Sequence, residues 1–64
     1  MTQKELMYVE DAIGHERSII DICNESLDLF EDEDLVSFIE KEIKKHSNLL
    51  GKLMSLLEDK ANEW

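Results

Sequence analysis

Apolar side chains recur through the first half of the chain at alternating steps of three and four residues, the spacing of one face of an α-helix. This series consists of Leu6, Val9, Ile13, Glu16, Ile20, Cys23, Leu27 and Phe30. Only Glu16 interrupts its apolar character. The pattern predicts an amphipathic helix over about residues 3–30, with one side packed and the other in water.

A second series with the same spacing runs through the other half of the chain. It consists of Leu35, Ile39, Glu42, His46, Leu49, Leu53 and Leu56, and a parallel row at steps of seven adds Val36, Ile43, Leu50 and Leu57. These residues predict a second helix over about residues 35–60, followed by a short tail that ends in Trp64. The two rows form a broader apolar surface than a two-stranded coiled coil needs, so this helix is expected to have more than one neighbour.

Start signals lie before both predicted helices. Thr2 and Glu5 have the spacing of a capping box, in which a hydroxyl and a carboxylate accept from two free backbone amides. Four successive acids at 31–34 oppose continuation of the first helix, because its C-terminal end already carries partial negative charge, and they suit the start of the second. Asp32 or Asp34 is the expected N-cap. A connection this short makes the helices antiparallel, so residues 1–64 are predicted to form one all-α domain, an antiparallel helical hairpin.

Two helices alone cannot bury apolar faces this broad. Exposed apolar residues of both helices would form an adhesive patch of several hundred Å². We therefore predict that two copies pair as a homodimeric four-helix bundle, or as a larger assembly built from such dimers.

Composition excludes several classes of partner. The chain has 64 residues, 16 acidic against 7 basic side chains, and a formal charge of −9. Nucleic acids and anionic membranes are unfavourable ligands, because binding them needs clustered basic residues. The single cysteine forms no internal disulfide, no apolar run is long enough to cross a bilayer, and the start of the sequence lacks the apolar core of a signal peptide. These features predict a cytoplasmic location.

The charges are divided unequally between the two predicted helices. Residues 2–30 contain seven acids and two bases, whereas residues 35–64 contain five of each. The lysines of the second helix gather on its outer side, at Lys41, Lys44, Lys45 and Lys52. This division favours packing of helix 1 beside helix 2, within one copy or between copies, although each exposed pair contributes little.

Three polar residues fall at positions that the pattern assigns to the core: Glu16, Glu42 and His46. A buried carboxylate needs a partner or a proton. In an antiparallel hairpin, His46 lies within one helical turn of Glu16, and a symmetric dimer doubles the set to four carboxylates and two imidazoles. Such sets bind iron or manganese in carboxylate bundles. The alternative is a structural ion-pair cluster that fixes register and oligomeric state.

Several short segments together resemble a known family. Residues 2–7 (Thr-Gln-Lys-Glu-Leu-Met), Glu10-Asp11 followed by His15-Glu16, and a second helix with Glu42 and His46 are similar to the short ferritin-like proteins of spore-forming bacteria, the spore coat protein F-like group. The resemblance implies a ferritin-like half-bundle that dimerises and is associated with the spore coat. It also implies Glu16 and His46 as metal ligands from the two helices. The ferritin-like pattern Glu-x-x-His is absent, because Ile43 stands three residues before His46, and this departure argues against oxidase chemistry.

Other candidate residues have simpler interpretations. His15 lies at the edge of the apolar face, where a surface histidine is expected, and Cys23 is expected to be a small core residue. The acidic stretch 31–34 lacks the spacing and the glycine of a calcium-binding EF-hand. No enzyme motif is present, so no catalytic residue is assigned. A different function, as an acidic adaptor or regulator whose first helix contacts a basic protein, fits the same composition.

Overall fold

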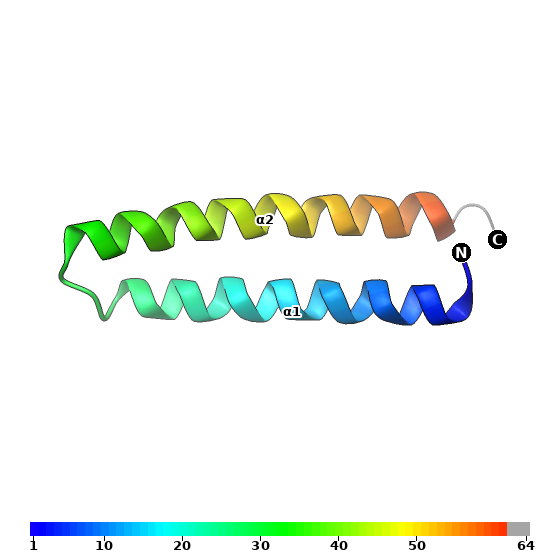
Figure 1. Ribbon diagram of the computed structural model, residues 1–64, viewed down its shortest axis with the longest axis horizontal. Helices are drawn as coiled ribbons and strands as arrows, with labels where there is room; N and C mark the ends of the chain where they lie inside the picture. The colour runs from blue at the N-terminus through cyan, green and yellow to red at the C-terminus, as the bar shows by residue number, and fades with distance from the viewer. Residues whose placement is uncertain (62–64) are drawn as a thin grey trace.

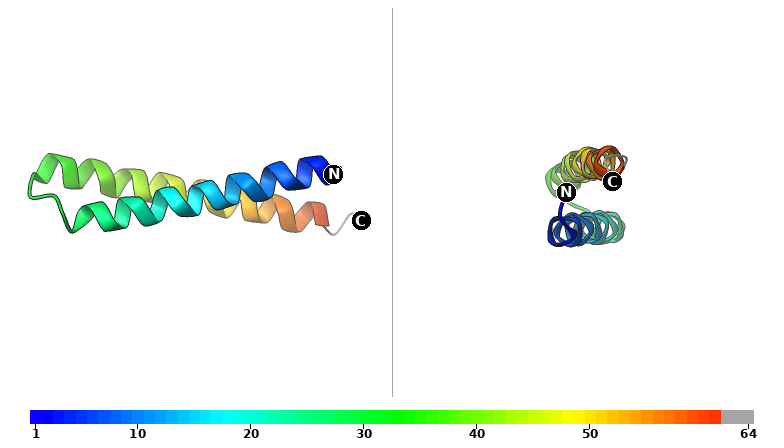
Figure 2. Two further views of the ribbon diagram at one scale, coloured as in Figure 1. Left: turned by 90° about the horizontal axis from the view of Figure 1, so that it is seen from below. Right: turned by 90° about the vertical axis from the view of Figure 1, so that its right-hand side faces the viewer.

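The chain forms an antiparallel pair of long helices. The computed structural model describes residues 1–61. Helix α1 spans Gln3–Leu27 and helix α2 spans Glu33–Ala61. They lie side by side, with the connection at one end and the start of α1 beside the end of α2 at the other (Figure 1). The hairpin measures 49 × 15 × 11 Å and is one helix thick (Figure 2). The predicted helical hairpin is confirmed; the last residues of the predicted tail, 62–64, lie outside the described part.

The predicted capping box begins α1. The backbone amide of Glu5 donates to Oγ1 of Thr2 at 3.1 Å, and the amide of Thr2 donates to Oε1 of Glu5 at 2.7 Å. The hydrogen bond from the Thr2 backbone amide, followed by the Thr2 side chain, lowers the pKa of the Glu5 carboxyl below its usual value. A lowered folded-state pKa means that this contribution to stability is present above the unfolded pKa and is lost as pH falls through the folded one.

Helix α1 ends three residues earlier than the predicted boundary near residue 30. Asp28 is its C-cap, and the amide of Leu29 donates to the carbonyl oxygen of Ser26. No basic residue stands in the last turn to offset the negative end of the helix dipole. Leu29 and Phe30 continue the apolar pattern in sequence but lie in the connection to α2.

Helix α2 begins at Glu33, two residues before the expected start, because Asp32 caps it. Oδ1 of Asp32 accepts from the amide of Asp34 at 2.8 Å and from the amide of Leu35 at 3.1 Å. Asp32, one of the two expected N-caps, therefore satisfies two of the free amides of the first turn. Glu33 and Asp34 then lie at the positive end of the helix dipole.

Removal of the Asp32 cap gives a direct test of this connection. Asp32→Ala should lower the free energy of unfolding by about 1 kcal/mol, because two amides lose their acceptor. Glu31→Ala is the matched control, since it removes the same charge from the same acidic stretch without touching these hydrogen bonds. Thermal unfolding followed by circular dichroism measures both. Equal effects of the two variants would show that charge, and not capping, governs the connection.

The packed surface of α1 agrees with the predicted series, but that of α2 is rotated toward the parallel row. Val36, Ile43, Leu50 and Leu57 are partly buried, whereas Leu35, Leu49 and Leu56 are 47%, 41% and 44% exposed. Ile39 and Leu53 are partly buried and belong to the packed surface. Thus α2 packs on α1 through the row at steps of seven, and the leucines of the other row lie at the side of the hairpin.

A single copy buries very little. Among the described residues only Ile13, at 8% exposure, is buried. The chain exposes 5129 Å², against about 4,200 Å² for a compact protein of 7.5 kDa by the usual scaling of surface with mass. The excess, about 900 Å², is close to what one partner buries in a standard protein interface.

The exposed apolar side chains are concentrated on one broad side of the hairpin. On α1 this side carries Tyr8, His15 and Ile22, which are exposed, and between them Ala12 and Ile19, which are partly buried. On α2 it carries Leu35, Phe38, Leu49 and Leu56, in one stripe with Glu42, Lys45 and Lys52. A groove lined by Glu10, Gly14, Arg17, Met54 and Glu58 marks the opposite side of both helices. We call the first surface the apolar face; its apolar members are Tyr8, Ala12, Ile19, Ile22, Leu35, Phe38, Leu49 and Leu56.

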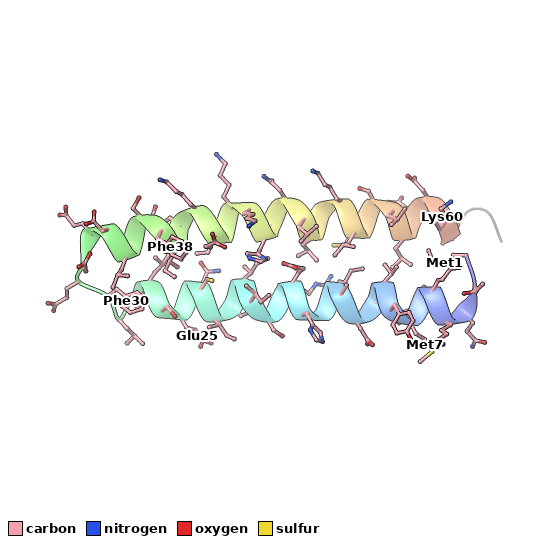
Figure 3. All side chains as sticks on the ribbon, viewed as in Figure 1. Met1, Met7, Glu25, Phe30, Phe38 and Lys60 are labelled. Atoms are coloured by element: carbon pink, nitrogen blue, oxygen red, sulfur yellow. The ribbon has the colours of Figure 1, made fainter. Side chains whose placement is uncertain are left out.

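Within residues 1–61, neither helix has a stretch long and apolar enough to span a membrane. Both helices are amphipathic, with charged side chains along the outer surface (Figure 3). Met7 and Glu25, for example, lie on the side of α1 that is turned away from α2.

Candidate functional site

The three polar residues predicted for the core form one cluster near the middle of the hairpin. Nδ1 of His46 lies 2.5 Å from Oε2 of Glu16, and Nε2 of the same ring lies 3.4 Å from Oε2 of Glu42. The side chains of Glu16, His46 and Glu42 are 13%, 20% and 30% exposed. The apolar pattern predicts all three for the space between the helices, and in the structure they contact one another there.

Helix geometry explains how the cluster forms. Glu16 belongs to the packed row of α1, so its carboxylate projects toward α2. Glu42 and His46 are four residues apart on α2, the spacing at which side chains on one helix face touch. His46 projects toward α1 and meets Glu16 across the hairpin, while Glu42 lies on the same helix and toward the apolar face.

The two carboxylates occupy opposite edges of the imidazole ring. An ionised carboxylate only accepts hydrogen bonds, so Nδ1 of His46 is the donor to Glu16. In a neutral ring with its proton on Nδ1, Nε2 presents a lone pair beside the Glu42 carboxylate. In an imidazolium, the protonated Nε2 forms an ion pair with that carboxylate. In the neutral state, two groups with lone pairs, Nε2 and the Glu42 carboxylate, lie side by side. In the imidazolium state, the positively charged ring lies between two carboxylates and forms an ion pair with each.

No three His, Cys, Asp or Glu side chains converge on one point to hold a metal ion anywhere in residues 1–61. For the predicted ligand set, the reason is that Glu16 and Glu42 contact different nitrogens of the ring. One copy therefore brings together Glu42 and Nε2 of His46 as a possible ligand pair, with Glu16 positioned to orient the ring from behind. The iron or manganese site predicted from Glu16, Glu42 and His46 stays a prediction.

The remaining candidates of the sequence lie outside this cluster. His15 is exposed on the apolar face, and Cys23 is a partly buried free cysteine on the packed side of α1. The acids at 31–34 serve the connection and the cap of α2. None of these side chains contacts Glu16, Glu42 or His46 by a hydrogen bond or ion pair among the described residues.

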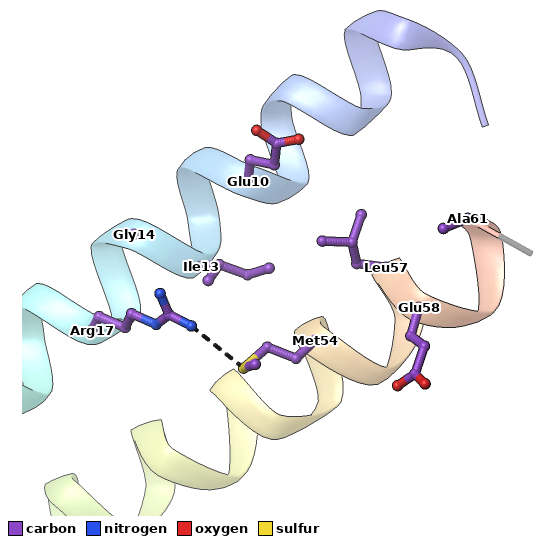
Figure 4. Close-up of a pocket in the computed structure, with 8 residues that line it drawn as sticks. All are labelled: Glu10, Ile13, Gly14, Arg17, Met54, Leu57, Glu58 and Ala61. Carbon is purple, nitrogen blue, oxygen red and sulfur yellow. Dashed lines mark hydrogen bonds between the residues drawn. The ribbon is translucent and has the colours of Figure 1, made fainter.

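Two surface grooves were not anticipated from the sequence. The first, of about 540 Å³, opens between the first half of α1 and the last turns of α2, with Glu10 and Glu58 at its rim (Figure 4). Nη2 of Arg17 lies 3.9 Å from Sδ of Met54 across this groove. The second follows the outside of α2 and is lined by Lys41, Lys44, Lys45, Asn48, Leu49 and Lys52. The lysine spacing indicated a basic side of α2, but no sequence signal indicated the Arg17–Met54 contact.

Comparisons with protein-family models, with curated proteins and with solved structures found no match to this chain. The resemblance to the short ferritin-like proteins of spore-forming bacteria therefore rests on the residues of the sequence alone.

Proposed function

We propose that the chain acts as a homodimer in which two hairpins form a ferritin-like four-helix bundle. The observation that carries this proposal is the exposure of the apolar face. Tyr8 is 62% exposed, Ile22 61% and Phe38 57%, all on the same side of the hairpin. In a symmetric dimer, the apolar face of a second copy covers this surface. An association with the spore coat, implied by the resemblance, belongs to the same proposal.

In this dimer the Glu16–His46–Glu42 cluster fixes how the helices align. A shift of α2 by one turn against α1 would place either Glu42 or the leucines at 49 and 50 opposite the Glu16 carboxylate, which would then lack a hydrogen-bond donor. Polar residues at core positions set register and oligomeric state in this way in coiled coils. The short contact between Glu16 and His46, at low exposure, supports this role.

The oligomeric state is tested by analytical ultracentrifugation of the full chain over a wide concentration range. The proposal requires a dimer, or an even-numbered assembly of dimers, in the micromolar range. A helical monomer at all concentrations would overturn it, and the exposed apolar face would then point to a different partner, such as the basic protein considered above.

Binding of a divalent metal is a second candidate, favoured by the separation of 3.4 Å between Nε2 of His46 and Oε2 of Glu42. Two ligands of a tetrahedral ion with bonds of about 2.1 Å stand about 3.4 Å apart. Glu16 on Nδ1 supplies the hydrogen bond that metal-binding histidines usually make through their other nitrogen. Remaining ligands would come from the second copy, because a dimer doubles the set. Iron or manganese are the metals that such Glu/His sets bind in helical bundles.

Metal addition to chelator-treated protein is expected to raise the melting temperature if this second candidate is correct. Saturation at about 100 times Kd adds about 2.7 kcal/mol of stability by mass action. Fe(II), Mn(II) and Zn(II) are added separately, and bound metal is measured after desalting. His46→Ala should abolish both binding and stabilisation, whereas Glu10→Ala, which removes a carboxylate from the groove on the side opposite the apolar face, should retain them. Unchanged melting curves for all three metals would leave the cluster with its structural role alone.

A further inference from the structure

We infer that the two hairpins of the dimer are related by a twofold axis parallel to the helices, so that α1 of each copy packs antiparallel on α2 of the other through the apolar face. This inference rests on the proposed homodimer and specifies its geometry. It also identifies the charged side chains that select the pairing: Asp11 and Glu25 on α1, and Lys41 and Lys52 on α2.

Two hairpins can stack through the apolar face in two symmetric ways. A twofold axis parallel to the helices places α1 against the partner's α2. A twofold axis across the helices places α1 against α1 and α2 against α2. Both arrangements bury the same apolar side chains, so burial alone does not distinguish them. The charges beside the apolar face do.

The edges of the apolar face carry opposite charges on the two helices. Next to the apolar face, on the side of α1 that is turned away from α2, lie Asp11 and Glu25, which are exposed and two heptads apart. The corresponding side of α2 is the lysine-lined groove, with Lys41, Lys45 and Lys52. Like charges directly opposite one another across an interface are unfavourable and suppress the wrong pairing. Stacking of α2 on α2 brings two lysine-lined surfaces together, whereas stacking of α1 on α2 pairs acids with lysines.

The register of the hairpin places these charges at matching heights. The contact between Glu16 and His46 shows that residues whose numbers sum to about 62 lie level within one copy. A twofold axis parallel to the helices preserves height, so the same rule applies between copies. Asp11 is then level with Lys52 of the partner subunit, and Glu25 lies about one turn from the height of Lys41 of the partner subunit. Within one copy these side chains project away from each other, so each pair forms only between copies.

The apolar side chains also match in this register. Tyr8 stands level with Leu56 of the partner subunit, and Leu29 stands level with Leu35 of the partner subunit. Leu29 is 79% exposed and Leu35 47% exposed in the single hairpin. The partner thus covers the leucine that α1 leaves outside its last turn, at the end of the hairpin where the connection lies.

Charge reversal distinguishes the two arrangements. Asp11→Lys places a lysine beside Lys52 of the partner subunit at two symmetry-related positions, and Lys52→Asp places an aspartate beside Asp11 of the partner subunit. Each variant alone should dimerise about tenfold more weakly than the wild type, a change of about 1.4 kcal/mol. An equimolar mixture should form a heterodimer of near wild-type affinity, because both of its cross-copy pairs are again opposite in charge.

Glu10→Lys is the matched control, because it makes the same change of charge on the same helix but faces the groove on the opposite side. It lowers the net negative charge as Asp11→Lys does, and should leave the dimer unchanged or slightly stronger. Sedimentation equilibrium gives Kd for each variant, and circular dichroism verifies that all remain helical. If Asp11→Lys strengthens the dimer as Glu10→Lys does, or if mixing restores nothing, the parallel axis is wrong while the homodimer stands. A wild type that never dimerises refutes both.

Discussion

Replacement of Ile22 by glutamate should dissociate the proposed dimer almost completely while leaving the hairpin folded. Ile22 is 61% exposed in one copy and belongs to the apolar face, in the half of the hairpin nearer the connection. In the monomer a charge at this position is solvated and costs at most about 0.5 kcal/mol, as surface substitutions usually do. In the dimer two symmetry-related carboxylates would be buried against apolar side chains. We expect Kd to rise by about 100-fold or more, as measured by sedimentation equilibrium.

Met7→Glu is the matched control for this variant. Met7 has the same exposure, 61%, and stands on the same helix, on the side of α1 turned away from α2 (Figure 3). It precedes by one heptad Gly14, which lines the groove on the side opposite the apolar face. Met7→Glu should leave Kd within about twofold of the wild-type value. If the two variants weaken the dimer equally, added negative charge opposes association wherever it stands on the surface, because the chain already carries a charge of −9.

The dependence of stability on protein concentration gives a second readout of Ile22→Glu. Wild-type melting temperature should rise with concentration, because dimerisation stabilises the folded state by mass action. The melting temperature of Ile22→Glu should be independent of concentration and lower. A variant that loses helicity at low temperature would instead show that one hairpin needs its partner to fold, and Ile22→Ala, which adds no charge, then measures the dimer contact alone.

The amphipathic pattern predicted the hairpin well because local physics decides most of it. The capping box of Thr2 and Glu5, the cap at Asp32 and the packed row of α1 each depend on neighbours within a few residues or on a single apolar stripe. The end of α1 was predicted too late, since Leu29 and Phe30 continue the apolar spacing. Whether the helix continues there depends on the cost of placing acids at its negative end, and on the competing cap at Asp32.

The sequence predicted two neighbouring apolar rows on α2 but did not indicate which leucines of the two rows face α1. Leu49 and Leu50 are adjacent in sequence and equally apolar, and each belongs to a complete row. Only contact with α1 decides that Leu50 faces inward and Leu49 sideways. The presence of two apolar rows also bears on function. Only one of the rows is needed to pack on α1, and the exposed leucines of the other row belong to the apolar face, where a second copy can pack.

The candidate site was predictable in composition but not in geometry. Spacing placed Glu16 and His46 within one turn of each other, and the structure brings them into direct contact. Which ring nitrogen meets which carboxylate depends on side-chain rotamers and on the exact offset of the helices. That detail decides the chemistry, since carboxylates on opposite edges of the ring contact different nitrogens, whereas two carboxylates beside one nitrogen would converge on a single metal position.

A double-mutant cycle on Glu16 and His46 should reveal strong coupling between them. His46→Leu leaves the Glu16 carboxylate, 13% exposed, without its donor, and should lower the free energy of unfolding by about 1.5–3 kcal/mol. Glu16→Leu similarly deprives the imidazole of its acceptor. The double variant replaces both by apolar groups and should cost less than the sum of the single changes, with a coupling energy of about 1–3 kcal/mol.

Urea denaturation at one fixed protein concentration measures all four corners of the cycle, so that any dimer contribution is compared at the same mass action. The cycle on Glu42 and His46 serves as the internal control. That contact is longer, at 3.4 Å, and Glu42 is 30% exposed, so its coupling should be clearly smaller because solvent screens it. Additive single changes at Glu16 and His46 would contradict a register-setting role. The double variant also distinguishes register from stability. If it unfolds at the wild-type urea concentration but forms oligomers of mixed size, the polar contact selects one alignment of the helices without adding to stability.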